Sequence, residues 1–372
     1  MKKRFWGLTI IMVLLSCFGC GEKAEKVFNA TKYGVSESNS GIENSRALQA
    51  LIDDVAKEGG TVYIPEGEYE LAENGRQTIG SHCIKMRSGV NIFGDGEGTV
   101  LKPVGVSRYG LDAFYFNDYL DAGEAVYLEN CQFKNFVIDG EGTSCEVYTS
   151  AGKGFMFNLF QNCRFERVIV KNTDATGFGV DCPIDGVIVD CVAVGCGKAA
   201  NKDSGGASGF GIGFGYAKQE NILIENCYAE NNKKFGFFLE HQGRFNAEKY
   251  GAEATGNFCV KNCFAVGNSF GFGGICASNT QYENCRSEGA AEYGVLFENS
   301  SSSKVVDCQC EGAGKAAFAV KQVGVYAVSE ISFVRCVGKN APAGVELASA
   351  EADLQDCFFE RVKEEIVRTG SQ

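Results

Sequence analysis

A two-residue motif recurs along most of this chain: a cysteine that directly follows an asparagine or an aspartate. Successive motif cysteines lie between 21 and 36 residues apart, and several intervals are close to 22 residues. A constant motif at variable spacing predicts a solenoid with rungs of about 22 residues, some of them lengthened by loops. The motif occurs at Asn130-Cys131, Asn162-Cys163, Asp190-Cys191, Asn226-Cys227, Asn262-Cys263, Asn284-Cys285, Asp307-Cys308 and Asp356-Cys357, with Arg335-Cys336 as a variant.

Short apolar segments precede most of the motifs, such as Ile222-Leu223-Ile224 before Asn226. No period of three to four residues is sustained after residue 60, so these segments predict strands rather than helices. The 48 glycines and 28 phenylalanines suit tight turns joined to strands with aromatic interiors. The sequence therefore predicts an all-β chain folded as a right-handed parallel β-helix.

The motif cysteines are expected to point inward as one stack of small side chains, with each Asn or Asp bonding backbone groups at a bend. Stacked equivalents would lie about 4.8 Å apart along the ladder, which suits disulfides poorly. Val168-Ile169-Val170 leads into Asn172-Thr173, so Thr173 is a candidate for the cysteine's place in that rung, with Cys163 on a different strand. Metal binding by the cysteines is disfavoured because the whole chain has two histidines, His82 and His241.

The N-terminus has the layout of an export signal, with three basic residues followed by the apolar run from Phe5 to Leu15. Leu14-Leu15-Ser16-Cys17 resembles the lipobox of bacterial lipoproteins, which makes Cys17 the expected lipidation site and Cys20 a weaker one. The alternative is an ordinary cleaved signal peptide. We expect residues 1–20 to be the signal and residues 21–372 one β-helix domain, anchored by lipid at a bacterial cell envelope.

Residues 28–60 differ from the ladder and predict an N-terminal cap. Asn44 or Ser45 is expected to start an amphipathic helix that carries Leu48, Leu51 and Ile52 on one face. The helix is expected to end at Gly59-Gly60, and Thr61 to Tyr69 to form a strand, a turn and a second strand. An open solenoid end exposes apolar core, so a helix laid across it is expected.

The segment from Phe28 to Val35, the helix, and Gly59-Gly60-Thr61-Val62-Tyr63-Ile64-Pro65-Glu66-Gly67 together resemble the start of the pectate lyase superfamily domain. Ser88 to Gly96 resembles its first rung, and the resemblance covers roughly residues 28–300. It implies a β-helix that acts on polysaccharides, among hydrolases, lyases, epimerases and phage tailspikes. Asn172-Thr173-Asp174 resembles a polygalacturonase motif, but the adjacent-aspartate and Gly-His motifs of those enzymes are absent.

Alignment of the glycine-led strands predicts which side chains form the outer face. Taking the first, third and fifth residues of each strand as outward, the fifth positions form a mostly polar column. Its neighbours at the third position are mostly small, with Phe238 as a possible stacking platform for a sugar ring. This arrangement suggests an open groove for a sugar. The alternative is that these glycines serve only local turns and close packing. The column consists of Asn158, Asp181, Gly213, Glu240, Ile275, Glu298 and Lys321.

Asp181 and Glu240 stand two rungs apart in this column, about 9–10 Å between Cα atoms. That separation suits an inverting hydrolase, in which one carboxylic acid and one carboxylate flank the glycosidic bond and a water. It would also suit a calcium ion that bridges protein and uronate in a lyase. His241 and Arg244 are candidates for a base and a carboxylate-binding group.

The leading hypothesis is a glycoside hydrolase of a uronate-containing or pectin-like polysaccharide, with Asp181, Glu240, His241 and Arg244 as catalytic residues. The expected substrate-binding residues are Asn158, Phe238, Asp203, Glu298 and Lys321, with Lys202 beside Asp203 on an overhanging loop. A calcium-dependent lyase and a non-catalytic glycan-binding protein are the alternatives. No cofactor is required for hydrolysis. The net charge of −12 disfavours nucleic acid and anionic membranes as partners, and also unaided binding of a polyanion, which favours hydrolysis over elimination.

Overall fold

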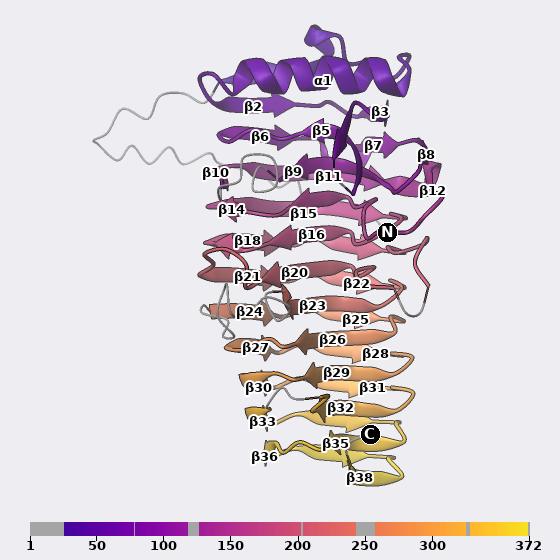
Figure 1. Cartoon of the computed structure of the whole chain (residues 1–372), viewed down its shortest axis with the longest axis vertical. Helices are drawn as coiled ribbons and strands as arrows, with labels where there is room; N and C mark the ends of the chain where they lie inside the picture. Colours follow the sequence, from indigo (N-terminus) through magenta and orange to yellow (C-terminus); the bar gives the residue numbers. More distant parts are fainter. Residues whose placement is uncertain are drawn as a thin grey trace, which may run out of the picture.

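The chain forms a right-handed parallel β-helix with a helix across one end, in a computed structural model that describes residues 26–77, 79–117, 126–201, 204–242, 257–324 and 328–370. Strands of successive rungs lie in register above one another, and the column runs from the capping helix to the C-terminal rung (Figure 1). The predicted fold is thus confirmed. Cys17, Cys20, Lys202, Asp203 and Arg244 lie outside the described residues. No helix in the described part is long and apolar enough to cross a membrane.

The capping helix, α1 (Gly41–Val55), starts earlier than predicted. Its N-cap is Ser40, whose backbone N–H donates to the Glu43 carboxylate in a capping box. Asn44 and Ser45 lie inside the first helical turns and are buried. Ser45 bonds the backbone of Ala72 in both directions, at 2.9 Å each. The two residues therefore fasten the helix to the first rung instead of capping it.

One face of the solenoid, which we call the site face, is a parallel stack extended at its N-terminal end by one antiparallel strand. Its strands alternate buried core residues with outward residues. In stacking order they are β4 (Gly75–Gln77), β5 (Gly80–Lys85), β9 (Leu111–Phe116), β13 (Phe155–Phe157), β16 (Phe178–Asp181), β20 (Phe210–Phe214), β23 (Phe235–His241), β26 (Phe270–Ile275), β29 (Tyr293–Glu298), β32 (Ala316–Lys321), β35 (Ala343–Ala348) and β38 (Glu364–Thr369).

A second face begins with β1 and continues with β2 after the cap helix. Its strands from β18 onward precede motif cysteines, whereas β11 and β15 directly follow Cys131 and Cys163. The predicted strand, turn and strand after the helix are β2 and β3. The second face contains β1 (Val27–Asn29), β2 (Gly60–Tyr63), β6 (Val90–Phe93), β11 (Gln132–Asp139), β15 (Arg164–Lys171), β18 (Gly186–Val189), β21 (Asn221–Glu225), β24 (Asn257–Lys261), β27 (Thr280–Glu283), β30 (Ser301–Val306), β33 (Ser329–Val334) and β36 (Asp353–Gln355).

The strands of a third face follow those of the second face along the chain. The long strands β11 and β15 run through both faces. Short strand ladders at the corners add β8 (Gly105–Ser107) with β12 (Thr143–Cys145), and β10 (Leu128–Glu129) with β14 (Phe160–Gln161) and β17 (Pro183–Ile184). The third face also contains β3 (Gly67–Leu71), β7 (Thr99–Pro103), β19 (Val192–Val194), β22 (Tyr228–Glu230), β25 (Phe264–Val266), β28 (Arg286–Glu288), β31 (Gln309–Glu311), β34 (Val337–Lys339) and β37 (Phe358–Glu360).

The motif cysteines point inward without disulfides, as predicted, since those of the described residues are free thiols and nearly all are buried. They form two stacks, because the pairing of β15 with β18 and β19 sets Cys163 one corner away from Cys191. Cys163 therefore belongs to a different strand from Cys191, as anticipated. The prediction that Thr173 takes the motif cysteine's place in its rung is wrong. Lys171 pairs with Val194, so Thr173 lies opposite Cys196 and not opposite the motif cysteine Cys191.

The residue before each motif cysteine has a left-handed backbone, with φ of 56° at Asn130 and 53° at Asp190. Asparagine and aspartate tolerate this conformation better than most residues, which explains their place at the bend. The predicted hydrogen bonds from these side chains to backbone groups are not formed. They bond one another between rungs, as in the 2.7 Å contact from Asn162 Nδ2 to Asn130 Oδ1.

Candidate active site

The predicted outward column is confirmed strand by strand on the site face. Asp181 pairs with Gly213, and Gly213 pairs with Glu240 in the next rung. Glu240 pairs with Ile275, which pairs with Glu298, and Glu298 pairs with Lys321. Asp181 and Glu240 are therefore separated by one glycine, two rungs or about 9.6 Å along the ladder.

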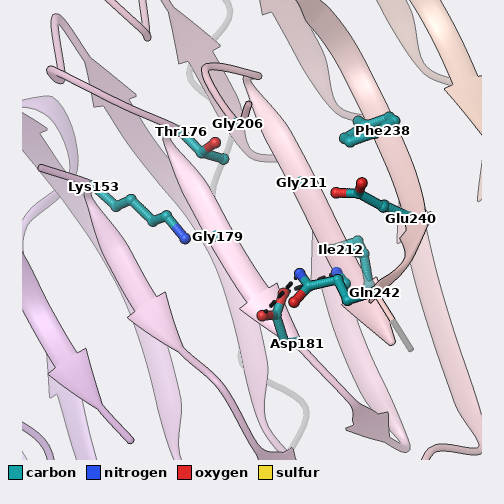
Figure 2. Close-up of a pocket in the computed structure, with 11 residues that line it drawn as sticks. Lys153, Thr176, Gly179, Asp181, Gly206, Gly211, Ile212, Phe238, Glu240 and Gln242 are labelled. Carbon is teal, nitrogen blue, oxygen red and sulfur yellow. Dashed lines mark hydrogen bonds between the residues drawn. The ribbon is translucent and has the colours of Figure 1, made fainter. Parts of the chain in front are cut away.

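A small, open pocket lies on these rungs, and we call it the acidic pocket. Figure 2 shows Asp181 on β16 and Glu240 two strands farther along, on β23, with the Lys153 side chain extended across the face toward Gly179. The pocket is lined by Lys153, Thr176, Gly179, Asp181, Gly206, Gly211, Ile212, Gly213, Phe238, Glu240 and Gln242.

Asp181 is buried, with 8% exposure, and its carboxylate accepts hydrogen bonds from three donors. Its Oδ1 accepts the Gly213 N–H at 2.9 Å. Its Oδ2 lies 3.1 Å from the Tyr216 hydroxyl and 3.2 Å from Gln242 Nε2. Burial raises the pKa of Asp181, and Lys153 and these donors offset part of that rise.

Gly213 makes this arrangement possible because it has no side chain. A Cβ atom at that position would lie 2.5 Å from Asp181 Oδ1 and would also overlap the Gln242 amide. Gly179 has the same function for Lys153, whose Cδ would lie 2.5 Å from a Cβ there. The glycines on this face therefore make room for the polar side chains of neighbouring rungs, and they do not form the open sugar floor that the sequence suggested.

Lys153 is the cation of the pocket, and sequence reasoning did not identify it. It directly precedes the glycine-led strand β13, and its Nζ lies 3.2 Å from Met156 Sδ. The buried Asp112 carboxylate accepts the backbone N–H groups of Gly152 and Lys153, at 2.8 and 2.7 Å. These bonds fix the backbone from which the lysine extends. The sequence signal at this position is only a lysine directly before a strand that begins with glycine, which does not show that its side chain enters the pocket.

Gln242 and Tyr216 were also missed. Both come from segments that follow strands of the site face, and the Tyr216 hydroxyl also lies 3.0 Å from the Asn158 carbonyl oxygen. Asn158 itself is not among the residues that line the acidic pocket. Burial and the neighbouring Asp181 and Cys182 raise the pKa of Tyr216, so its hydroxyl stays protonated and acts as a donor.

His241 does not face the pocket, and its assignment as a base there is wrong. Strand alternation turns it away from Glu240, and its side chain is 1% exposed. Its ring meets Phe214 edge to face at a centroid distance of 5.4 Å and fits against Gly215. The imidazole is part of the solenoid's interior.

The structure places the predicted substrate-binding residues at different positions on the site face. Phe238 lines the acidic pocket but is 9% exposed, and its ring stacks on Phe235 at 4.4 Å, so it does not present an open platform. Glu298 lines a separate groove farther along the face. Lys321 forms an ion pair with Glu346 at 3.1 Å and lies over the Tyr293 ring, outside both. The predicted overhanging loop is present at Gly206, which lines the pocket.

No cluster of three or more histidine, cysteine or acidic side chains arranged for a metal ion occurs in the described residues. A calcium ion that bridges the protein and a uronate stays a prediction. Such an ion would need oxygen ligands from the substrate as well as from the protein.

Comparison with known proteins identifies a sequence family and solved structures with the same fold. The sequence model of the family described as "Rhamnogalacturonase A/epimerase, pectate lyase-like" matches residues 27–246. The mannuronan C5-epimerase AlgE1 of Azotobacter vinelandii is 29% identical over 222 residues, which cover 57% of this chain and 14% of that protein. AlgE4 of the same organism is 30% identical over 162 residues, or 41% of this chain and 27% of that one. The chain spans only a small part of these relatives.

The solved structures that resemble the chain share its fold. The A-module of AlgE4 from Azotobacter vinelandii matches with a TM-score of 0.64 at 18% identity, over 93% of this chain and 99% of that one. A tailspike protein mutant of E. coli bacteriophage HK620, solved with a pentasaccharide, matches with a TM-score of 0.65 at 15% identity, over 92% and 65%. PfbA, a surface adhesin of Streptococcus pneumoniae, matches with a TM-score of 0.59 at 13% identity, over 92% and 93%.

Proposed function

Because the chain belongs to the rhamnogalacturonase A/epimerase, pectate lyase-like family, we propose that it modifies a uronate-containing polysaccharide in the acidic pocket. The observation that supports this proposal best is the Lys153 side chain beside the buried Asp181 carboxyl in one pocket. Lysine supplies the positive charge that a uronate carboxylate needs. The negative net charge disfavours unaided binding of a polyanion, and Lys153 supplies a local positive charge for it.

Abstraction of the C5 proton of the uronate is the reaction class we favour. Lys153 and the Gln242 amide would face the sugar carboxylate and stabilise the negative charge that develops on it. Glu240 would take the C5 proton, and the electron pair would pass into the carboxylate. Asp181, whose pKa burial raises, would return a proton to the opposite face of C5. The product is the C5 epimer, the reaction for which the related mannuronan C5-epimerases are named.

Two other outcomes begin from the same pocket. If the electron pair instead expels the oxygen at C4, the reaction is an elimination and leaves an unsaturated uronate, as in the lyase alternative. Hydrolysis is the second candidate, favoured by the separation of Asp181 and Glu240 across Gly213. The spacing of about 9.6 Å between their strands is close to the separation of the two carboxyl groups in inverting hydrolases.

One experiment separates the three reactions. The protein is incubated with mannuronan, polygalacturonate and rhamnogalacturonan in D2O, with and without calcium. Deuterium at C5 in the recovered polymer identifies epimerisation, absorbance of unsaturated uronates identifies elimination, and new reducing ends without absorbance identify hydrolysis. Glycan binding with none of these products would support the non-catalytic alternative and contradict the proposal.

We also propose that the protein is exported and anchored by lipid at Cys17. The support is the sequence of residues 1–20 alone. Expression in a bacterial host with a radiolabelled fatty acid tests it. Label should enter the wild type and disappear in Cys17→Ala, and label that persists in Cys17→Ala but not Cys20→Ala would move the site to Cys20.

A further inference from the structure

The motif cysteines from Cys191 onward form one continuous column in the solenoid, which we call the thiol column. The strands that precede them pair rung by rung, for example Val189 with Glu225 and Val334 with Gln355. Each cysteine follows its strand by the same two residues, so each lies directly over the next. The column consists of Cys191, Cys227, Cys263, Cys285, Cys308, Cys336 and Cys357.

The sulfur atoms of the column are in register because one side-chain conformation is repeated. Cys336 Sγ lies 3.5 Å from the carbonyl oxygen of Val334 and 3.3 Å from that of Val305 in the preceding rung. The equivalent two contacts recur in every rung from Cys227 to Cys357. Successive sulfurs are therefore separated by the rung spacing, about 4.8 Å.

This separation does not suit a disulfide, but it suits an ion held between two sulfurs. A disulfide needs about 2.05 Å between its sulfur atoms. A metal–thiolate bond is about 2.3 Å in zinc sites, so two such bonds in line span about 4.6 Å. Thiolates select soft ions such as copper(I), which accepts two ligands in a line. The spacing of neighbouring sulfurs in the column thus matches the geometry of a two-coordinate soft ion.

The surroundings of the sulfurs favour a cation between them. Each sulfur from Cys227 to Cys357 lies beside two backbone carbonyl oxygens, whose partial negative charges face it. A monovalent ion that binds two thiols and releases one proton leaves one thiolate, one thiol and the ion, which together have no net charge. No atom changes its oxidation state in this exchange. An uncharged product avoids the cost of a net charge in an apolar interior.

The last rung makes the column accessible. Cys357 is half-buried, whereas Cys336 and the other five members are buried. An ion from solvent therefore meets the pair formed by Cys336 and Cys357 first.

We propose that the thiol column binds soft monovalent cations, copper(I) or silver(I), in line between successive sulfurs, with the first ion between Cys336 and Cys357. Such a site needs only two ligands. It is therefore compatible with the described residues, which contain no metal-binding group of three or more histidine, cysteine or acidic side chains. A tetrahedral zinc site in the column stays disfavoured, because zinc takes four ligands. The site lies apart from the acidic pocket and does not depend on the proposed function.

The test measures copper(I) binding by competition. The full chain, with Cys17→Ala and Cys20→Ala so that only the cysteines of the solenoid remain, is titrated without oxygen against copper(I) in a coloured chelator. We expect this parent protein to withdraw at least one ion per chain. Cys357→Ser should weaken binding of the first ion by about 100-fold or more, because changes beyond the direct ligands already cost 10–100-fold at metal sites. Cys336→Ala should have the same effect.

Matched controls come from half-buried cysteines that have no sulfur in a neighbouring rung. Cys145 pairs with Ser107, and Cys259 lies between Leu223 and Gln281. Cys145→Ser and Cys259→Ser should withdraw copper(I) like the parent. Circular dichroism of each variant confirms that it is folded.

X-ray absorption of the parent loaded with one copper(I) ion identifies the ligands directly. Two sulfur neighbours and no nitrogen or oxygen neighbour are expected. The proposal would be overturned by a parent that withdraws no copper(I), by a folded Cys357→Ser that binds the first ion as tightly as the parent, or by an ion with three or more ligands.

Discussion

The side-chain amide of Gln242 reaches across Gly213 to the carboxylate of Asp181, with 3.2 Å between Nε2 and Oδ2. The two residues are 61 positions apart in the chain and lie two rungs apart on the site face. This contact closes one end of the acidic pocket and directs the second carboxyl oxygen of Asp181. Several expected outcomes depend on it.

Asp181→Asn should lower turnover by about 10² to 10⁴-fold, because it removes the group assigned to proton transfer while preserving its shape. The measurement is initial rate on the polymer that reacts in D2O, with circular dichroism to confirm the fold. Asp190→Asn is the matched control, since Asp190 is exposed on another face and lies in the Asn ladder. Equal rates for the two variants would remove Asp181 from the mechanism.

Gly213→Ala should reduce activity by about 10²-fold, because the new methyl group displaces the Asp181 carboxylate and the Gln242 amide. The backbone at this position is not left-handed, so strain is not expected to unfold the protein. Kinetics and thermal unfolding should be measured together. Gly370→Ala, where a Cβ meets nothing within 4 Å, is the control. Full activity in Gly213→Ala would show that the pocket tolerates a different position of Asp181.

The stability of the protein should fall as pH rises through the window between the unfolded and folded pKa values of Asp181. The unfolded value is about 3.9. Burial raises the folded pKa, so within the window the native state binds more protons than the unfolded state. At pH values above this window, the ionised carboxylate of the buried Asp181 continues to destabilise the fold. Asp181→Asn should therefore raise Tm at pH 7 relative to wild type and lose that advantage below pH 3.

Scanning calorimetry of both proteins from about pH 2 to pH 8 checks this expectation. The pKa values of the buried Asp112 and Asp174 are raised in the same direction, so the wild type also contains their contribution. The difference between wild type and Asp181→Asn isolates one group. A Tm for Asp181→Asn below that of wild type at pH 7 would mean that the ionised carboxylate stabilises the pocket.

The motif cysteines from Cys131 to Cys336 should be inert toward thiol reagents in the folded protein. They are free and buried, and burial raises the pKa of several of them, Cys191 and Cys308 included. Titration with a thiol reagent should label the half-buried Cys145, Cys259, Cys276 and Cys357 first, and the buried stacked cysteines only on unfolding. Reducing agent should leave Tm unchanged. A drop in Tm with reductant would indicate a disulfide.

The fold and the outward column could be predicted because both follow from repeated local patterns. The Asn-Cys motif marks the bend of each rung, and the pairing of Asp181 with Gly213 and Glu240 follows from counting strands between bends. The same period of two places His241 on the inner side of β23, so its assignment to the pocket could have been avoided from sequence alone.

The remaining site residues could not be predicted from such patterns. Lys153 enters the pocket because its side chain lies along the face over Gly179, which depends on the rotamer and on the next rung. Gln242 lies beyond the strand that carries Glu240, and Tyr216 lies in the segment that follows β20. The helix start was placed too late because Ser40 and Glu43 form the capping box upstream of the apolar face.

Each strand of the solenoid pairs mainly with the strand directly above and the strand directly below it. The acidic pocket occupies the rungs of β13 to β23. The length of such a molecule and its chemistry can therefore be altered independently. Whole rungs could be duplicated or deleted beyond β29 to change how much polymer the protein follows, while the reacting groups keep their mutual distances.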